Sequence, residues 1–278
     1  MVAISKLLNQ GLLLTGQSVY QDVATPDQAS VEQYNVIKYL GGSAPYIQRP
    51  GYGISTEIPQ GCEIQQVQVF SRHGERYPSK GDGARFNEIL EKFKNYKHDF
   101  KGPLEFLNNY EYFVTEPSYY EKETSSSNSQ GLYAGTTNTL RHGAAFRAKY
   151  GRLYTPNSVL PVFTSNSGRC YQTSNYFARG FLGDDYSEDK VKYVVIDEDP
   201  KMGANSLTPR YGCKNYDSDI NKKKINGYNQ EYLLDIIDRF EDKNPDLNLT
   251  PSDISSLFLW SAFEINVRGS SPFTKLRR

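Results

Sequence analysis

The stretch Arg72-His73-Gly74-Glu75-Arg76-Tyr77-Pro78 places a histidine between two arginines, directly after the alternating apolar residues Val67, Val69 and Phe70. Alternation over residues 65–70 predicts a β-strand, so the histidine is expected at its carboxyl end, where open α/β sheets bind ligands. Two guanidinium groups suit a phosphate, because they are always charged and each can donate two hydrogen bonds to a pair of phosphate oxygens. An imidazole nitrogen beside them can attack a phosphoryl group and form a covalent intermediate. The alternative is a basic surface turn that ends in proline.

These seven residues resemble the signature Arg-His-Gly-x-Arg-x-Pro of the histidine acid phosphatases, a family that includes the fungal secreted acid phosphatases and phytases. Three further segments are similar to the fungal branch of this family, in the same order along the chain, from Tyr39 to Phe273. They are Tyr39-Leu40-Gly41-Gly42-Ser43-Ala44-Pro45-Tyr46 with Gly51-Tyr52-Gly53-Ile54, then Phe163-Thr164-Ser165-Asn166-Ser167-Gly168-Arg169-Cys170, and then Ser261-Ala262-Phe263-Glu264-Ile265-Asn266-Val267-Arg268-Gly269.

The resemblance implies an α/β fold with a phosphoglycerate-mutase-like central sheet, helices on its faces and an inserted, mostly helical subdomain. It implies that His73 is the nucleophile and that Arg72 and Arg76 bind the substrate phosphate. Arg169 is implied as a third phosphate ligand, at a helix start where backbone amides also favour an anion. Glu75 is at most a substrate-side residue. The implied reaction is hydrolysis of phosphomonoesters, with phytate among the candidates, through a phosphohistidine and without a cofactor.

The family's general acid lies in a histidine–aspartate pair far towards the carboxyl end, and this chain shows no counterpart. Its three histidines are His73, His98 and His142. We interpret His98-Asp99 as a coincidence in the inserted region, and His142 as part of a polar helix face. The family pattern stops after Phe273. We therefore expect a truncated or mis-joined gene product or a fragment, which lacks the C-terminal part of the sheet domain and whose activity is in doubt.

Three other functions stay open at this point. The chain can be a catalytically impaired remnant that binds phosphate but turns over slowly or not at all. It can be a secreted structural or adhesion protein in which the arginine–histidine turn is incidental. It can also be a phosphoryl-transfer enzyme like the related mutases, against which the fungal acid phosphatase segments argue.

Composition limits the partners of the chain. Its 278 residues include 32 basic and 32 acidic residues, so no global field favours nucleic acid or an anionic membrane. No run approaches the roughly twenty apolar residues that a membrane-spanning helix needs. The expected partner is a small phosphorylated substrate, with no nucleic acid and no membrane. The sequence leaves the oligomeric state open.

Two weak signals point to secretion. Residues 1–20 resemble a poor signal peptide, because polar residues interrupt the leucine run, and an ordinary short helix is the alternative. Asn248-Leu249-Thr250 is a candidate glycosylation sequon. With the fungal resemblance, these features predict a secreted protein or one in the cell wall or periplasmic space.

The three cysteines, Cys62, Cys170 and Cys213, are an odd number. In a secreted chain at least one of them lacks an intrachain partner, and the family's missing segment would supply disulfide partners. In a cytosolic protein, three buried and inert thiols would be ordinary. Their spacing fits no metal site.

Hydrophobic patterns predict the remaining elements. Strands are expected at residues 161–164 and 193–196, and helices at residues 86–93, 140–150, 232–240 and from Pro251 onwards, with Thr250 as the N-cap. The polar segment 121–131 is expected to be a mobile loop. We expect residues 80–154 to form the helical subdomain, inserted between the two parts, 21–79 and 155–278, of an incomplete α/β domain.

Overall fold

The computed structural model describes residues 36–46, 57–203, 205–217, 219–222, 224 and 230–277. The predicted signal peptide at residues 1–20 and the family-like stretch at residues 51–54 lie outside the described residues. No helix within the described ranges is long and apolar enough to cross a membrane.

Helices dominate the described part of the chain. The α-helices are α3 (Lys80–Asn95), α4 (Gly135–Tyr150), α5 (Gly168–Leu182), α6 (Pro209–Gly212), α8 (Glu231–Glu241) and α9 (Pro251–Arg268). The strands are β1 (Leu160–Ser165) and β2 (Val191–Ile196). The 3-10 helices are η1 (Val36–Tyr39), η2 (Gly41–Ser43), η3 (Gly102–Asn109), η4 (Pro117–Tyr119), η5 (Gly151–Leu153), η6 (Gly183–Asp185), η7 (Glu188–Lys190), η8 (Pro200–Met202) and η9 (Pro272–Arg277). The predicted helices and the two strands after residue 160 are confirmed.

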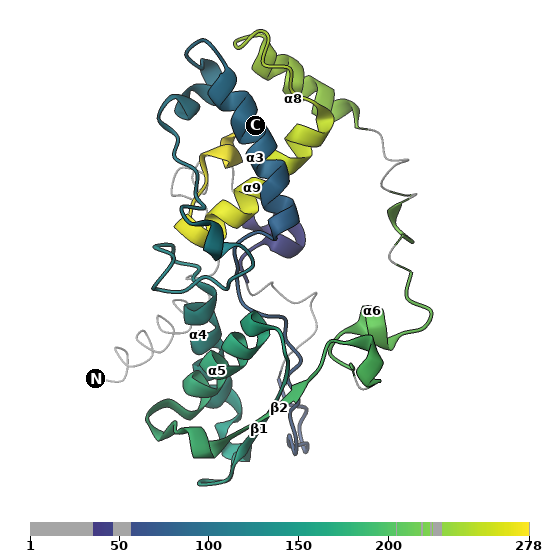
Figure 1. Cartoon of the computed structure of the whole chain (residues 1–278). Helices are drawn as coiled ribbons and strands as arrows, with labels where there is room; N and C mark the ends of the chain where they lie inside the picture. Colours follow the sequence, from purple (N-terminus) through teal and green to yellow (C-terminus); the bar gives the residue numbers. More distant parts are fainter. Residues whose placement is uncertain are drawn as a thin grey trace, which may run out of the picture.

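The elements form two groups, which Figure 1 shows one above the other. Helices α3, α8 and α9 make the upper group, whose core contains Phe86, Phe240 and Trp260. Helices α4 and α5 lie with β1 and β2 in the lower group, around Phe181 and Val191. Helices α3 and α4 both belong to the predicted insert at 80–154, yet they contribute to different cores. This division between two cores does not decide where the domains begin and end, so the boundaries at residues 79–80 and 154–155 stay a prediction.

The sheet confirms the α/β class but differs from the predicted strands. Strands β1 and β2 pair in parallel, with Thr164 opposite Val195. Residues 65–70 form no strand, so that prediction is wrong, and the side chain of Phe70 is 80% exposed. An alternating pattern indicates only that one face of an extended segment is apolar. A β-strand also needs a neighbouring strand, with which its backbone N–H and C=O groups form hydrogen bonds. No described segment pairs with residues 65–70.

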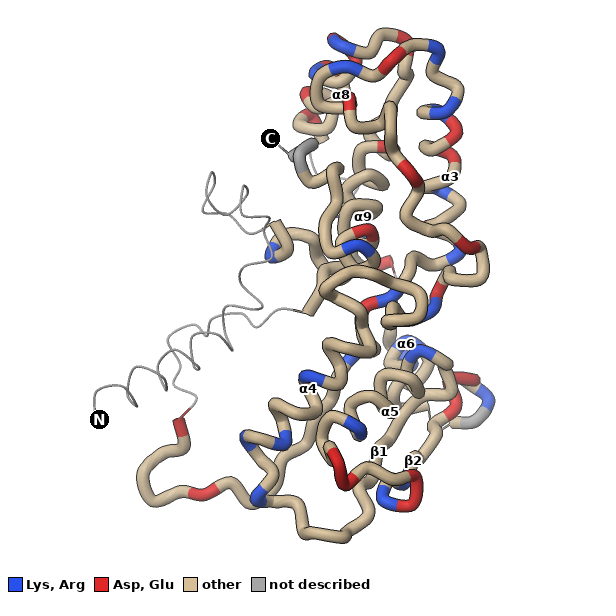
Figure 2. Tube along the Cα trace, turned by 90° about the vertical axis from the view of Figure 1, so that its left-hand side faces the viewer, with Lys and Arg blue, Asp and Glu red and all other residues tan. Residues whose placement is uncertain are grey.

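Charges are distributed differently over the two groups. Helix α3 carries both basic and acidic residues and α8 is mainly acidic, whereas α4 carries basic residues and no acidic residue (Figure 2). The basic residues of α4 are Arg141, Arg147 and Lys149. Helix α4 packs closely on α5 because Gly143 has no side chain: a Cβ there would lie 2.2 Å from the carbonyl oxygen of Phe177.

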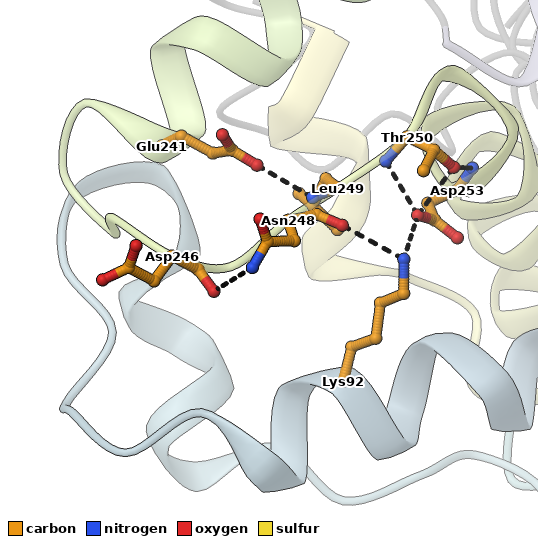
Figure 3. Close-up of polar contacts among 7 residues, drawn as sticks. All are labelled: Lys92, Glu241, Asp246, Asn248, Leu249, Thr250 and Asp253. Carbon is orange, nitrogen blue, oxygen red and sulfur yellow. Dashed lines mark hydrogen bonds and ion pairs between the residues drawn. The ribbon is translucent and has the colours of Figure 1, made fainter.

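The start of α9 is fixed by side-chain hydrogen bonds, as its sequence predicts (Figure 3). The backbone N–H of Asp253 donates to Oγ1 of Thr250 over 3.2 Å, and the backbone N–H of Thr250 donates to Oδ2 of Asp253 over 2.8 Å. This arrangement is a capping box, with Pro251 at the first helical turn. Lys92 of α3 donates to Oδ2 of Asp253 over 2.7 Å, so the cap also ties α3 to α9.

Replacing Thr250 with alanine should lower the free energy of unfolding by about 1 kcal/mol, because one backbone N–H of α9 loses its acceptor. Urea denaturation followed by circular dichroism measures this change. Thr250→Ser keeps the hydroxyl and is the matched control, which should unfold like the wild type. Equal stability of the alanine variant and the wild type would show that the cap contributes nothing.

The polar segment 121–131 is not the mobile loop that its composition predicts. Glu123, Thr124 and Ser125 are buried. The backbone N–H of Thr124 donates to the carbonyl of Glu75 over 2.9 Å, and the N–H of Tyr77 donates to the carbonyl of Lys122 over 2.9 Å. Because these bonds join the segment to the 72–78 motif, its polar residues are ordered by tertiary contacts that composition does not report.

Candidate active site

The imidazole of His73 is half-buried and held in one orientation. Its Nδ1 lies 2.7 Å from the carbonyl oxygen of Gly74. A carbonyl oxygen can only accept a hydrogen bond, so Nδ1 carries the proton in neutral His73. The lone pair is then on Nε2, which is the nitrogen that is free to attack a substrate.

Three arginine charges act on this imidazole. Arg72 donates to the carbonyl of Gly42, and Nη1 of Arg76 donates to the carbonyl of Tyr77 over 2.7 Å. The guanidinium of Arg76 lies 5.3 Å from the ring centroid of Phe263 on α9. Arg169 lies in the first turn of α5, directly after β1, as the sequence predicts. The charges of all three lower the pKa of His73, so each of them lies within electrostatic range of the imidazole.

The surroundings of His73 disfavour its protonated form. Burial is the main cause that lowers the pKa of His73 to about 4, from the ordinary 6.5. The charges of Arg72, Arg169 and Arg76 lower this pKa further, whereas the hydrogen bond to the Gly74 carbonyl acts in the opposite direction. The imidazole therefore stays neutral and nucleophilic in mildly acidic solution, where an ordinary histidine is already charged.

A pH titration of the His73 C2–H proton resonance in ¹H NMR should give a midpoint near 4, because the imidazole is buried and protonation also adds a positive charge near three guanidinium groups. The resonance is assigned by its loss in His73→Ala. A midpoint at or above 6.5 would mean that the imidazole is not buried near the arginines as described.

A cavity of about 650 Å³ opens at the motif. Its wall includes Arg72, His73 and Arg76, the segment 67–70, and His142 of α4. We predicted that His142 belongs to a polar helix face, but it lines this cavity, stacked against Tyr46 with ring centroids 5.8 Å apart. Burial lowers the pKa of His142. No local sequence pattern indicates this placement, because Tyr46 and α4 meet only through the tertiary fold.

Two buried carboxyl groups lie behind the motif. Glu75, which we expected to be at most a substrate-side residue, is buried and also lines the cavity: its Oε1 accepts from the backbone N–H of Tyr46 over 2.7 Å and from Nδ2 of Asn138 over 3.0 Å. Oε1 of Glu123 accepts from Oγ1 of Thr173 over 2.9 Å. Burial raises the pKa of both carboxyls, that of Glu123 to about 8. Sequence reasoning missed Glu123, Thr173 and Asn138.

Comparison with known proteins decides the family. The profile described as "Histidine phosphatase superfamily (branch 2)" matches residues 63–276, which include the whole 72–78 motif and Arg169. The chain belongs to this superfamily. The resemblance inferred from the motif and the fungal segments is therefore confirmed.

Named relatives of this histidine phosphatase are fungal. Phytase PHO112 of Candida albicans is 65% identical over 278 residues, which cover 99% of this chain and 60% of that protein. The repressible acid phosphatase of Saccharomyces cerevisiae is 38% identical over 275 residues, which cover 97% of this chain and 57% of that protein. The crystal structure of the phytase from D. castellii is 57% identical with a TM-score of 0.84, over 94% of this chain and 57% of that one. This likeness confirms the fold.

The histidine phosphatase chain thus spans a little under two thirds of the length of the relatives that it matches. Their printed names describe phytases and acid phosphatases. Those activities belong to the longer proteins.

Arg169, His98, Asn248 and the three cysteines are not among the residues that line the cavity. His98 is exposed after α3 and contacts the ring of Tyr96. Asn248 is exposed just before α9, where its Nδ2 donates to the carbonyl of Asp246 over 2.8 Å (Figure 3). The cysteines are unbonded, with Cys62 and Cys213 exposed. Among the described residues of this histidine phosphatase, no three or more histidine, cysteine or acidic side chains are placed to hold a metal ion.

Proposed function

We propose that the chain is an acid phosphatase that hydrolyses phosphomonoesters through a phosphohistidine at His73. The observation that carries this proposal is one oriented, neutral imidazole in a cavity, with three arginine charges acting on it. The family, whose profile spans the site, supports it.

In the proposed reaction, Arg72, Arg76 and Arg169 bind the phosphate oxygens. Nε2 of His73 attacks the phosphorus, and the bond from phosphorus to the leaving oxygen breaks. The three guanidinium groups stabilise the charge that builds on the phosphoryl oxygens. Water then attacks the phosphorus, breaks the bond to Nε2 and releases inorganic phosphate, so the imidazole returns to its starting state.

Aryl and alkyl phosphates differ in whether the leaving oxygen needs a proton when its bond to phosphorus breaks. No aspartate lines the cavity within the described residues, and the pair His98-Asp99 lies exposed after α3. A phenolate with a low pKa leaves without a proton, whereas an alkoxide needs a donor. We therefore infer that this chain by itself cleaves activated aryl phosphates and is slow with alkyl phosphates such as phytate.

A second candidate function follows from the same observation. With no aspartate on the described cavity wall, the chain can instead be a phosphate-binding remnant, in which the arginines bind the anion and turnover is negligible. The arginine charges near His73 support binding, and the absence of an aspartate from the described cavity wall favours this alternative for alkyl esters.

We also propose small phosphorylated molecules as the substrates and a secreted or cell-wall location. A cavity of about 650 Å³ is within the usual range for small-molecule sites. The exposed sequon at Asn248 and the leucine-rich residues 1–20 support secretion. Glycosylation of Asn248 stays a proposal, which a mass shift lost in Asn248→Gln would test.

Rapid quenching with ³²P-labelled 4-nitrophenyl phosphate and ³²P-labelled glycerol phosphate at pH 5 separates these functions. A phosphatase shows an acid-labile label on the protein and release of phosphate, faster from the aryl ester. A binding remnant retains inorganic phosphate in equilibrium dialysis but takes up no label from either ester. A folded chain that shows neither signal would exclude both functions and leave a structural role.

A further inference from the structure

The backbone of Gly74, next to the nucleophile, makes one hydrogen bond with His73 and one with Thr173, which lies outside the motif. Its carbonyl accepts from Nδ1 of His73, and its N–H donates to Oγ1 of Thr173 over 2.8 Å. The hydroxyl of Thr173 in turn donates to Oε1 of Glu123 over 2.9 Å. The three bonds form one chain, from a buried carboxyl group to the imidazole.

Glu123 is itself held in place by contacts of the segment 121–131 to which it belongs, and which we predicted to be a mobile loop. It forms an isolated antiparallel bridge with Arg76, and its backbone carbonyl accepts from Nδ2 of Asn128 over 3.1 Å. Its side chain is 1% exposed, so it has little freedom to leave Thr173. Thr173 is also buried, on α5, the helix that carries Arg169.

Gly74 has almost no room to turn. A Cβ atom at this position would lie 2.2 Å from Oε1 of Glu123 and 2.9 Å from the carbonyl oxygen of Gly135. The N–H and the carbonyl of Gly74 belong to two successive peptide planes, which are joined at its Cα. With the N–H bonded to Thr173 and the Cα packed against Glu123, Gly74 has little freedom to rotate about φ and ψ. The direction of its carbonyl, and with it the proton on Nδ1 of His73, then depends on these contacts.

We propose that Thr173 is a positioning residue that holds the backbone of Gly74, with Glu123 holding its hydroxyl, so that His73 presents Nε2 to the phosphorus. This inference rests on the proposed phosphohistidine chemistry. Oε1 of Glu123 accepts from Thr173, and Oε2 is buried without a hydrogen-bond partner among the described residues, so no other described hydrogen bond to the carboxyl group competes with that of Thr173.

The test uses four variants in matched pairs. Thr173→Val keeps the shape but removes the hydroxyl, and Thr173→Ser restores it. Glu123→Leu removes the acceptor, and Glu123→Gln keeps one. A ¹⁵N–¹H correlation spectrum of the imidazoles reads the tautomer of His73 directly, because the chain has only three histidines. The signals of His98 and His142 report whether each variant is folded.

We expect the wild type, Thr173→Ser and Glu123→Gln to show His73 with the proton on Nδ1. Thr173→Val and Glu123→Leu should show a mixture of the two tautomers and form the phosphoenzyme roughly ten to a hundred times more slowly, with little change in the affinity for inorganic phosphate. Should Thr173→Val fail to fold, Glu123→Leu carries the test.

An unchanged tautomer in folded Thr173→Val or Glu123→Leu would overturn the inference, whether or not the wild type takes up label. Absence of label in the wild type, with the expected tautomers in all variants, would overturn the phosphohistidine function and leave the positioning contact in place. The two failures are therefore distinguishable.

Discussion

Replacing His73 with alanine should abolish the acid-labile phosphoenzyme and reduce aryl phosphate hydrolysis by at least roughly a thousandfold, because no other described imidazole is oriented among the three arginines. Inorganic phosphate should still bind, because neutral His73 contributes no charge to the attraction. Rapid quench labelling at pH 5 and equilibrium dialysis measure the two quantities on the same preparation.

His98→Ala is the matched control, because His98 is exposed and does not line the cavity. It should label like the wild type. His142→Ala should also label, with a higher KM, since His142 forms part of the cavity wall with Tyr46. Labelling that survives in His73→Ala and disappears in His142→Ala would show that His142, and not His73, is the nucleophile.

The second large effect is a loss of stability as pH rises from 6.5 to 8. Burial of Glu123, with a weaker contribution from the neighbouring carboxyl of Glu75, raises its pKa to about 8 from the ordinary 4.5. The folded chain then retains a proton that the unfolded chain has already lost. Stability from this group is complete below pH 4.5 and is lost as pH rises towards 8.

The titration of His73 limits the pH range in which the loss of stability caused by Glu123 can be measured. The lowered pKa of His73 makes the folded state bind a proton more weakly than the unfolded state, so its contribution to stability falls as pH drops from 6.5 towards 4. Between those values the two groups oppose each other. Above pH 6.5 only the carboxyls act, and the loss should be about 2 kcal/mol by pH 8, at about 1.4 kcal/mol per pH unit.

Urea denaturation at pH 6.5, 7, 7.5 and 8 measures this slope in the wild type and in Glu123→Gln. The glutamine variant keeps an acceptor for Thr173 but has no proton to lose, so its stability should fall much less over the same range. A wild type whose stability is level from pH 6.5 to 8 would show that Glu123 is already ionised in the folded protein. Equal slopes in both proteins would assign the loss to another group.

Local sequence patterns predicted those parts of the structure that depend on neighbouring residues. The apolar run at 161–164 and the cap at Thr250 each describe a few consecutive residues, and β1 and α9 form where these patterns place them. The strand predicted at 65–70 did not form, because its pattern says nothing about a pairing partner. The 72–78 motif was predicted from its residues and from family resemblance, and Arg169 from resemblance, and the charges of all three arginines lower the pKa of His73.

The supporting residues could not be predicted, because their roles arise from contacts between distant segments. Thr173 is 99 residues from Gly74, and Glu123 is 50 residues from Thr173. Glu123 lies in a serine-rich stretch whose composition is typical of an exposed loop. Its burial follows from backbone bonds to the motif, and no local pattern in the sequence reports them.

Locating the phosphoryl group tests the central claim most directly. The chain is quenched during turnover of 4-nitrophenyl phosphate, digested at neutral pH, and the phosphorylated peptide is sequenced by mass spectrometry. We expect one phosphorylated residue, His73, in the peptide that spans the 72–78 motif. Phosphate release with the phosphoryl group on another residue, or with no phosphorylated peptide at all, would contradict catalysis through His73.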